Sequence, residues 1–177
     1  MKRELRLSGS GGQGLILAGI IIAEAGINQG LNAIQSQSYG PEARGGASKA
    51  EVIISDEEIY FPKVRKPDIL LALSQKAFEQ YIHDLDSNSI IVVDESIQTN
   101  DRIEVDKIYK LPISKTASEK IGKSMVANIV ALGVLSTLMP EIESNFILEA
   151  ILHRVPQGTE NLNKNAFEEG VELLKFK

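Results

Sequence analysis

Residues 3–14 read Arg3-Glu4-Leu5-Arg6-Leu7-Ser8-Gly9-Ser10-Gly11-Gly12-Gln13-Gly14, and an apolar segment follows them to about Asn28. Charged and apolar residues alternate as far as Ser8, which predicts a strand. The glycines predict a tight turn, and the apolar segment predicts a helix. Because this helix has almost no polar face, we expect it to be packed on several sides, partly against another polypeptide.

The rest of the first two thirds predicts more strands than helices. Residues 32–37 and 48–55 read as strands, and no helix fits in the loop between them. A parallel pair needs a crossover of a dozen or more residues, so we expect these two strands to be antiparallel neighbours. Further strands are predicted at 68–73, 89–94 and 107–113, with a helix over 74–85.

The last third is predicted to be helical. Thr116-Ala117-Ser118-Glu119 has the spacing of a capping box, and a long buried helix is expected from Met125 to Met139, where Pro140 stops it. Apolar residues at helical spacing predict two more helices. The fold class is therefore α/β: a Rossmann-like three-layer α/β/α sandwich with a mixed, mostly parallel sheet, an antiparallel pair and a C-terminal helical cap. We expect residues 1–177 to form a single domain.

Composition excludes several functions. The net charge is −5, with no basic stripe to hold nucleic acid. Cysteine is absent, so this chain holds no disulfide and no cysteine-ligated cluster. His83 and His153 have no ligand motif around them, so no metal site is predicted. The start of the chain lacks a signal peptide and no apolar run reaches membrane-spanning length, so we expect a cytoplasmic protein that does not enter the membrane.

The glycine turn admits two interpretations. Gly9, Gly11 and Gly14 fit the G-x-G-x-x-G pattern of a dinucleotide site, and a helix start beside glycines offers free N–H groups to an anion. That pattern also requires an acid on the second strand, yet residues 32–37 contain neither Asp nor Glu. We therefore favour a structural role for the turn, including Gly12 and Gln13, in which the glycines let the helix pack closely on the sheet. A weaker anion-binding role stays open.

A second motif follows at residues 38–46. This loop contains Tyr39, Gly40, Glu42, Arg44 and the pair Gly45-Gly46. Its glycines allow sharp turns, and an Arg guanidinium can bind a carboxylate or phosphate through two hydrogen bonds. One interpretation is a functional loop; the other is an ordered surface loop in which Glu42 and Arg44 pair with each other or with solvent.

Together the two motifs resemble the gamma subunit or domain of the 2-oxoacid:ferredoxin oxidoreductases. Gly9-Ser10-Gly11-Gly12-Gln13-Gly14 before an apolar helix is followed, at a characteristic separation, by Gln37-Ser38-Tyr39-Gly40-Pro41-Glu42-Ala43-Arg44-Gly45-Gly46. The similarity continues through Ile59-Tyr60-Phe61-Pro62, Pro67-Asp68-Ile69-Leu70 and the late helix with Asn128 and Gly133. It covers nearly the whole chain and is greatest to the 2-oxoglutarate-using branch, although pyruvate and branched-chain enzymes share much of the pattern.

The resemblance implies a subunit that helps to build an oxidoreductase complex. Enzymes of this family decarboxylate a 2-oxoacid to its acyl-CoA and reduce ferredoxin. Their thiamine diphosphate lies between alpha- and beta-type subunits, and their iron–sulfur clusters belong to beta-type or ferredoxin-like delta subunits. We therefore expect no cofactor, redox centre or catalytic residue in this chain, whose partners would be those subunits. Without them, the apolar surface would favour self-association.

The chemistry and setting of three residues suggest roles for them. Arg44 is expected to have an electrostatic role at a partner or anion, and Tyr39 to anchor an interface. Asn128 lies among apolar residues, so we expect it to be buried with hydrogen bonds to a loop. Two alternatives are a small nicotinamide- or flavin-dependent enzyme, and a free-standing assembly module for another complex.

Overall fold

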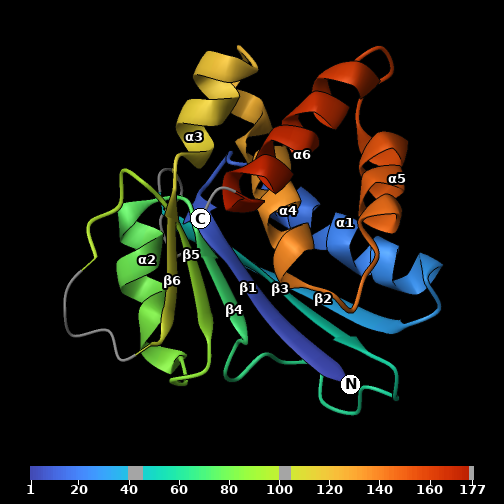
Figure 1. The fold of residues 1–177 in the computed structure, drawn as a ribbon. Coiled ribbons are helices and arrows are strands. Elements are labelled where there is room, and N and C mark those ends of the chain that lie inside the picture. The colour runs from blue at the N-terminus through green and yellow to red at the C-terminus, as the bar shows by residue number, and fades with distance from the viewer. Residues whose placement is uncertain (40–45, 100–104, 176–177) are drawn as a thin grey trace.

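The computed structural model describes residues 1–39, 46–99 and 105–175, with Tyr39 described by its backbone alone. These residues form a six-stranded sheet with helices on both faces (Figure 1). The strands are β1 (Lys2–Ser10), β2 (Asn32–Tyr39), β3 (Ala47–Ser55), β4 (Ile69–Ala72), β5 (Ile90–Asp94) and β6 (Lys107–Leu111). The helical elements are α1 (Leu15–Asn28), α2 (Gln75–Tyr81), η1 (Ile82–Asp84), α3 (Ile113–Lys115), η2 (Thr116–Lys120), η3 (Ser124–Val126), α4 (Ala127–Leu138), α5 (Ser144–Arg154) and α6 (Glu160–Lys175).

The sheet is mixed, with the order β2-β3-β1-β4-β5-β6. β1 pairs antiparallel with β3 and parallel with β4, and β4, β5 and β6 continue in parallel. The antiparallel pairing of β2 with β3 runs from Asn32↔Ser55 to Tyr39↔Ser48. The prediction that these two strands are antiparallel neighbours is confirmed, and its reason holds: six residues between Tyr39 and Gly46 cannot contain a crossover helix.

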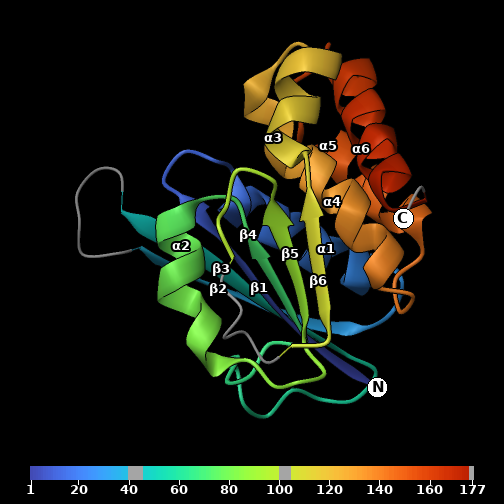
Figure 2. The ribbon, with the colours of Figure 1, turned by 60° about the vertical axis from the view of Figure 1, so that its left-hand side comes forward.

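The helices are divided unequally between the two faces of the sheet. α1, α4, α5 and α6 cover one face and α2 covers part of the other (Figure 2). Leu5 and Leu7 point into the larger core with α1 and α4, whereas Ile91 and Val93 pack with Phe78 of α2 in the smaller one. The three-layer α/β/α sandwich with a C-terminal helical cap is therefore confirmed. None of the described helices is long and apolar enough to cross a bilayer.

The predicted capping box at Thr116–Glu119 is wrong. The chain is already helical from Ile113, and the Thr116 N–H donates to the Pro112 carbonyl at 2.8 Å. Thr116 is 3% exposed and lies inside a helical segment that ends near Gly122, so its side chain caps nothing. Proline at the start of the segment was the better signal, because it lacks the N–H that a first helical turn leaves unpaired. The long helix expected at 125–139 is confirmed as α4, from 127 to 138.

An ion-pair cluster joins α5 to α1. Glu24 on α1 accepts hydrogen bonds from Arg154 Nε and pairs with His153 Nδ1, the latter at 2.9 Å. Burial raises the pKa of the Glu24 carboxyl, but the hydrogen bonds and charges of Arg154 and His153 outweigh this effect and hold the pKa below its usual 4.5. The ionised form of Glu24 therefore stabilises the folded protein.

Glu24→Gln is expected to lower the free energy of unfolding by about 0.5–1 kcal/mol at pH 7, as for other partly exposed ion pairs. Because the folded-state pKa is depressed, the carboxylate's contribution is present above the unfolded-state pKa and is lost as the pH falls below about 4.5. Urea denaturation of parent and variant at pH 7 and pH 3.5 measures this difference. If the two proteins differed in free energy of unfolding by the same amount at both pH values, ionised Glu24 would not be the source of the difference.

Candidate functional site

The glycine turn joins the end of β1 to the start of α1. Gly12 and Gly14 have φ angles of 91° and 72°, in the left-handed region that glycine adopts without strain. The Gln13 N–H donates to the Ser10 carbonyl at 3.2 Å and closes the turn. Gly11 and Gly12 are exposed, and a Cβ added at either position would meet no atom within 4 Å. The tip of the turn is therefore an open backbone surface.

Gln13 braces the turn against the neighbouring strand. Its Oε1 accepts from the Ser10 N–H at 2.7 Å, and its Nε2 donates to the Leu73 carbonyl, just beyond β4, at 3.2 Å. The chain leaves β1 for α1 on one face and leaves β4 for α2 on the other, so this is the switch point where open α/β sheets bind ligands. The Gln13 side chain spans that crevice, which disfavours a dinucleotide site there.

Asn128, in the first turn of α4, holds the start of α1. It is 4% exposed, and its Nδ2 donates to the Gly14 carbonyl at 3.1 Å. The predicted burial with a hydrogen bond to a loop is confirmed, and the loop is the glycine turn itself. Gly14 precedes α1 without a side-chain cap, and the first turn of α1 carries no acid. The positive end of this helix dipole therefore faces the turn without a side chain to neutralise it.

The C-terminal end of the second motif, at Gly46, contacts the glycine turn. The Gly11 N–H donates to the Gly46 carbonyl at 3.4 Å, and Ser48 Oγ donates to the Gly9 carbonyl at 3.3 Å. The remaining predicted residues of this motif, Gly40, Glu42, Arg44 and Gly45, lie outside the described residues, as does the Tyr39 side chain. Their roles stay predictions.

Sequence reasoning did not find every residue at this edge of the sheet. Leu73 and Ser48 contribute through a carbonyl and a hydroxyl, for which the sequence has no signal. Met125 was assigned to a buried helix, but it lies in η3, three residues before Asn128, and is 78% exposed. Its exposure depends on the path of the chain in η3, just before α4, and hydrophobicity alone does not predict that path.

Comparison with known proteins identifies the family. Residues 4–173 match the family model described as pyruvate ferredoxin/flavodoxin oxidoreductase. The chain belongs to this family. It is 51% identical to the 2-oxoglutarate synthase subunit KorC of Methanocaldococcus jannaschii, over 99% of this chain and 95% of that protein. It is 46% identical to the KorC of Methanothermobacter marburgensis, over 98% of this chain and 97% of that protein.

Solved structures of this oxidoreductase family have the same fold. The keto/oxoacid ferredoxin oxidoreductase gamma subunit from Geobacter sulfurreducens has a TM-score of 0.86 at 42% identity and covers 98% of this chain and 96% of its own. The 2-oxoglutarate:ferredoxin oxidoreductase from Magnetococcus marinus, with 2-oxoglutarate, coenzyme A and succinyl-CoA bound, has a TM-score of 0.87 at 27% identity. The match covers 99% of this chain and 31% of that one. The resemblance inferred from the two glycine motifs is confirmed.

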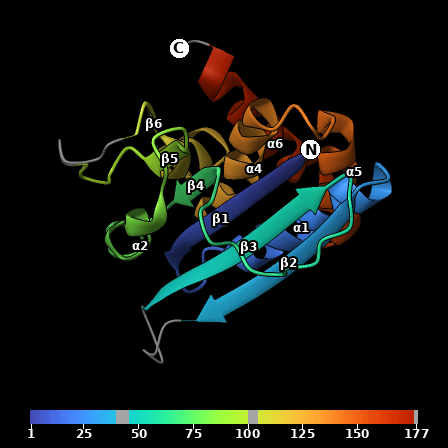
Figure 3. The ribbon, with the colours of Figure 1, turned by 90° about the horizontal axis from the view of Figure 1, so that it is seen from below.

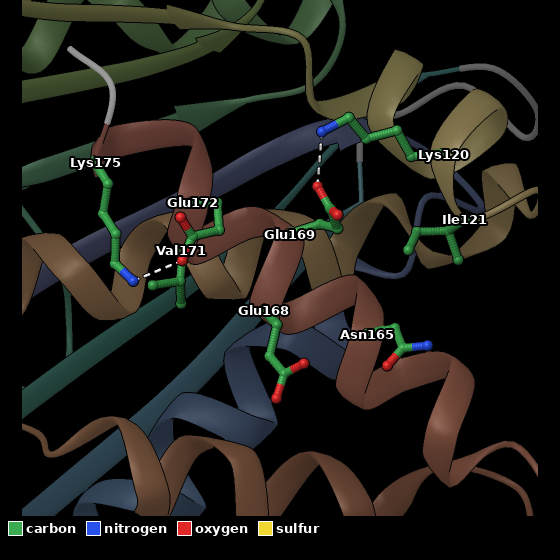
Figure 4. Close-up of a pocket in the computed structure, with 8 residues that line it drawn as sticks. All are labelled: Lys120, Ile121, Asn165, Glu168, Glu169, Val171, Glu172 and Lys175. Carbon is green, nitrogen blue, oxygen red and sulfur yellow. Dashed lines mark hydrogen bonds and ion pairs between the residues drawn. The ribbon is translucent and has the colours of Figure 1, made fainter.

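A separate hollow in this member of the family lies beside α6 (Figure 4). It measures about 650 Å³, and four of its charged groups form two ion pairs: Lys120 with Glu169 at 2.9 Å and Lys175 with Glu172 at 2.6 Å. It shares no lining residue with the glycine turn. The described residues also contain no group of three His, Asp or Glu side chains able to hold a metal ion. The better candidate site is therefore the glycine turn, residues 9–14, with the adjoining Gly46 and Ser48 and the start of α1, which we call the glycine edge.

Proposed function

We propose that this chain is the gamma subunit of a 2-oxoglutarate:ferredoxin oxidoreductase complex. The complex would convert 2-oxoglutarate and coenzyme A to succinyl-CoA and carbon dioxide and pass the released electrons to ferredoxin. The observation that carries the proposal is the nearly full-length similarity to KorC subunits together with a matching gamma-subunit fold. We expect the complex to be cytoplasmic.

We propose further that this subunit assembles the complex without performing its redox chemistry. The polar side chains of the glycine edge support this role, because Gln13 and Asn128 are both committed to backbone carbonyls. The chain has no cysteine to hold a cluster. Thiamine diphosphate, iron–sulfur clusters and coenzyme A would belong to the whole complex, held mainly by alpha- and beta-type subunits and a ferredoxin-like delta subunit.

The glycine edge is the surface that we assign to a neighbouring subunit. The open backbone at Gly11 and Gly12 allows close approach, and the uncapped start of α1 favours a negative group such as a carboxylate or phosphate carried by that neighbour. The adjoining loop would add the Arg44 guanidinium and the Tyr39 ring. Met125, three residues before Asn128, is 78% exposed and would supply apolar contact area.

Arg44→Ala tests this assignment in the co-expressed complex. Loss of a charge-assisted contact at an interface is expected to reduce co-purification with the alpha- and beta-type subunits, or 2-oxoglutarate-dependent viologen reduction, by roughly tenfold. Lys164→Ala, on the exposed side of α6, is the matched control and should change neither. Circular dichroism of the isolated subunit should be the same for both variants. If the Arg44→Ala complex assembled fully and kept its activity, the loop would not belong to the interface.

The alternative of a small dinucleotide-dependent enzyme makes the opposite prediction. Its support is the G-x-G-x-x-G spacing after β1, but Gln13 spans the crevice and β2 offers no acid for a ribose hydroxyl. Calorimetric titration of the isolated chain with NAD and FAD is expected to give no binding. The other alternative is an assembly module for a different complex. It would replace our proposal if genes for alpha- and beta-type subunits were absent from the same genome.

A further inference from the structure

Residues 56–67 lie between β3 and β4 and present aromatic side chains to solvent. We call this stretch the underside segment. Tyr60 is 87% exposed and Phe61 is 44% exposed. The segment begins after Ser55, which pairs with Lys2, so it lies at the opposite end of β1 from the glycine turn. Figure 3 shows it crossing beneath the strands. This surface is therefore separate from the glycine edge.

The underside segment is held in place even though it has no regular secondary structure. Val64 and Pro67 are buried, and Asn32 Nδ2 donates to the Glu57 carbonyl at 3.2 Å. The Arg65 guanidinium lies 4.3 Å from the centre of the Phe61 ring. The backbone of the segment and the Phe61 ring are thus held before any contact is made, which lowers the entropy cost of binding.

Charge is arranged in order along this segment. Glu57 and Glu58 precede the aromatic pair, and Lys63 and Arg65 follow it. All four are exposed, and none has an ion pair with another side chain in the part of the chain that the structure describes. Glu57 and Glu58 thus lie on one side of the aromatic pair along the chain and the two basic residues on the other.

Two hollows show where Glu58 and Arg65 lie relative to the strands. Glu58 and Tyr60 line a hollow of about 300 Å³ beside the start of β2. Arg65 lines another, of about 290 Å³, beside Glu4 and Asp68 at the β1–β4 side. Glu58 therefore lies on the β2 side of the segment and Arg65 on the β1–β4 side, where Lys2 and Lys66 line the hollow together with the two carboxylates.

We propose that the underside segment binds a second copy of this chain. A two-fold rotation would place the acidic end of one segment on the basic end of the other, with Tyr60 and Phe61 of both copies in the centre. Such self-complementarity is what an isologous interface requires. A partner surface of a single charge would be repelled by one of the two ends. The patch consists of two aromatic side chains and their charged neighbours, so we expect a weak dimer that dissociates on dilution. This inference does not depend on the proposed function.

Sedimentation of the isolated full-length chain at increasing concentration tests the proposal. We expect a monomer–dimer equilibrium that Tyr60→Ser weakens at least tenfold, because truncating a central aromatic anchor commonly costs more than about 1.4 kcal/mol. Met125→Ser is the matched control, since Met125 is 78% exposed but lies in η3, outside the underside segment. Dimerisation that survived Tyr60→Ser but was lost in Met125→Ser would overturn the proposal, as would a monomer at all concentrations.

A charge exchange tests the two-fold arrangement itself. Glu57→Lys with Glu58→Lys makes both ends of the segment basic, and Lys63→Glu with Arg65→Glu makes both ends acidic. Each double variant alone is expected to be monomeric, whereas an equimolar mixture should form heterodimers. Thermal unfolding confirms that each variant is folded. Failure of the mixture to associate would exclude the antiparallel pairing.

Discussion

Gly170→Ala is expected to destabilise the protein by about 3 kcal/mol or more, although the same change in a helix ordinarily stabilises by roughly 0.5–1 kcal/mol. The reason is the crossing of α4 and α6, where Gly133 and Gly170 face each other. A Cβ built on Gly170 would lie 2.9 Å from the carbonyl carbon of Val130 and 3.0 Å from Gly133 Cα. These are backbone atoms, so relief requires the two helices to separate.

The expected change in the free energy of unfolding has the opposite sign to that of an ordinary Gly→Ala change in a helix, which makes the prediction easy to test. Guanidinium denaturation of Gly170→Ala and of Asn165→Ala compares two alanines placed in the same helix. Asn165 is exposed, so its replacement should leave the free energy of unfolding unchanged or slightly higher. Equal stability of the two variants would show that α6 can shift away from α4 at little cost. Gly133→Ala should behave like Gly170→Ala, because its Cβ would meet Gly170 Cα at 2.9 Å.

Glu51→Gln is expected to lower the free energy of unfolding by about 3 kcal/mol, because it leaves a buried guanidinium without its main counter-charge. Arg6, on β1, is 3% exposed, and its Nε donates to Glu51 Oε1 at 2.8 Å. The Lys49 ammonium donates to the same oxygen at 2.8 Å. A neutral amide would therefore face two cations beneath α2.

Asp84→Asn is the matched control for this cluster. Asp84 also accepts a hydrogen bond from Arg6 Nη1 at 3.2 Å, but its side chain is 63% exposed, so water can replace it. We expect a change below about 1 kcal/mol for this variant. Urea denaturation near neutral pH measures both. A large effect of Asp84→Asn with a small effect of Glu51→Gln would show that Asp84, and not Glu51, is the main counter-charge of Arg6.

The order of strands and helices could be predicted from local patterns. Alternation in residues 3–8, glycines after it and apolar periodicity to Asn28 act over a few residues, where backbone sterics and burial operate directly. The antiparallel β2–β3 pair followed from chain length, since the loop is too short for a crossover. The start of the last helical region was predicted wrongly at Thr116, because its spacing mimics a cap inside a segment that begins at Ile113.

The sequence by itself determined the family, the α/β class and the two glycine motifs, together with the burial of Asn128. Only the tertiary structure decided which groups meet. Gln13 reaches Leu73, 60 residues away, and Asn128 reaches Gly14 across 114 residues. Gly133 and Gly170 likewise meet only because α4 and α6 cross there. Propensity acts between near neighbours in the chain, whereas such contacts depend on how the core packs whole elements against one another.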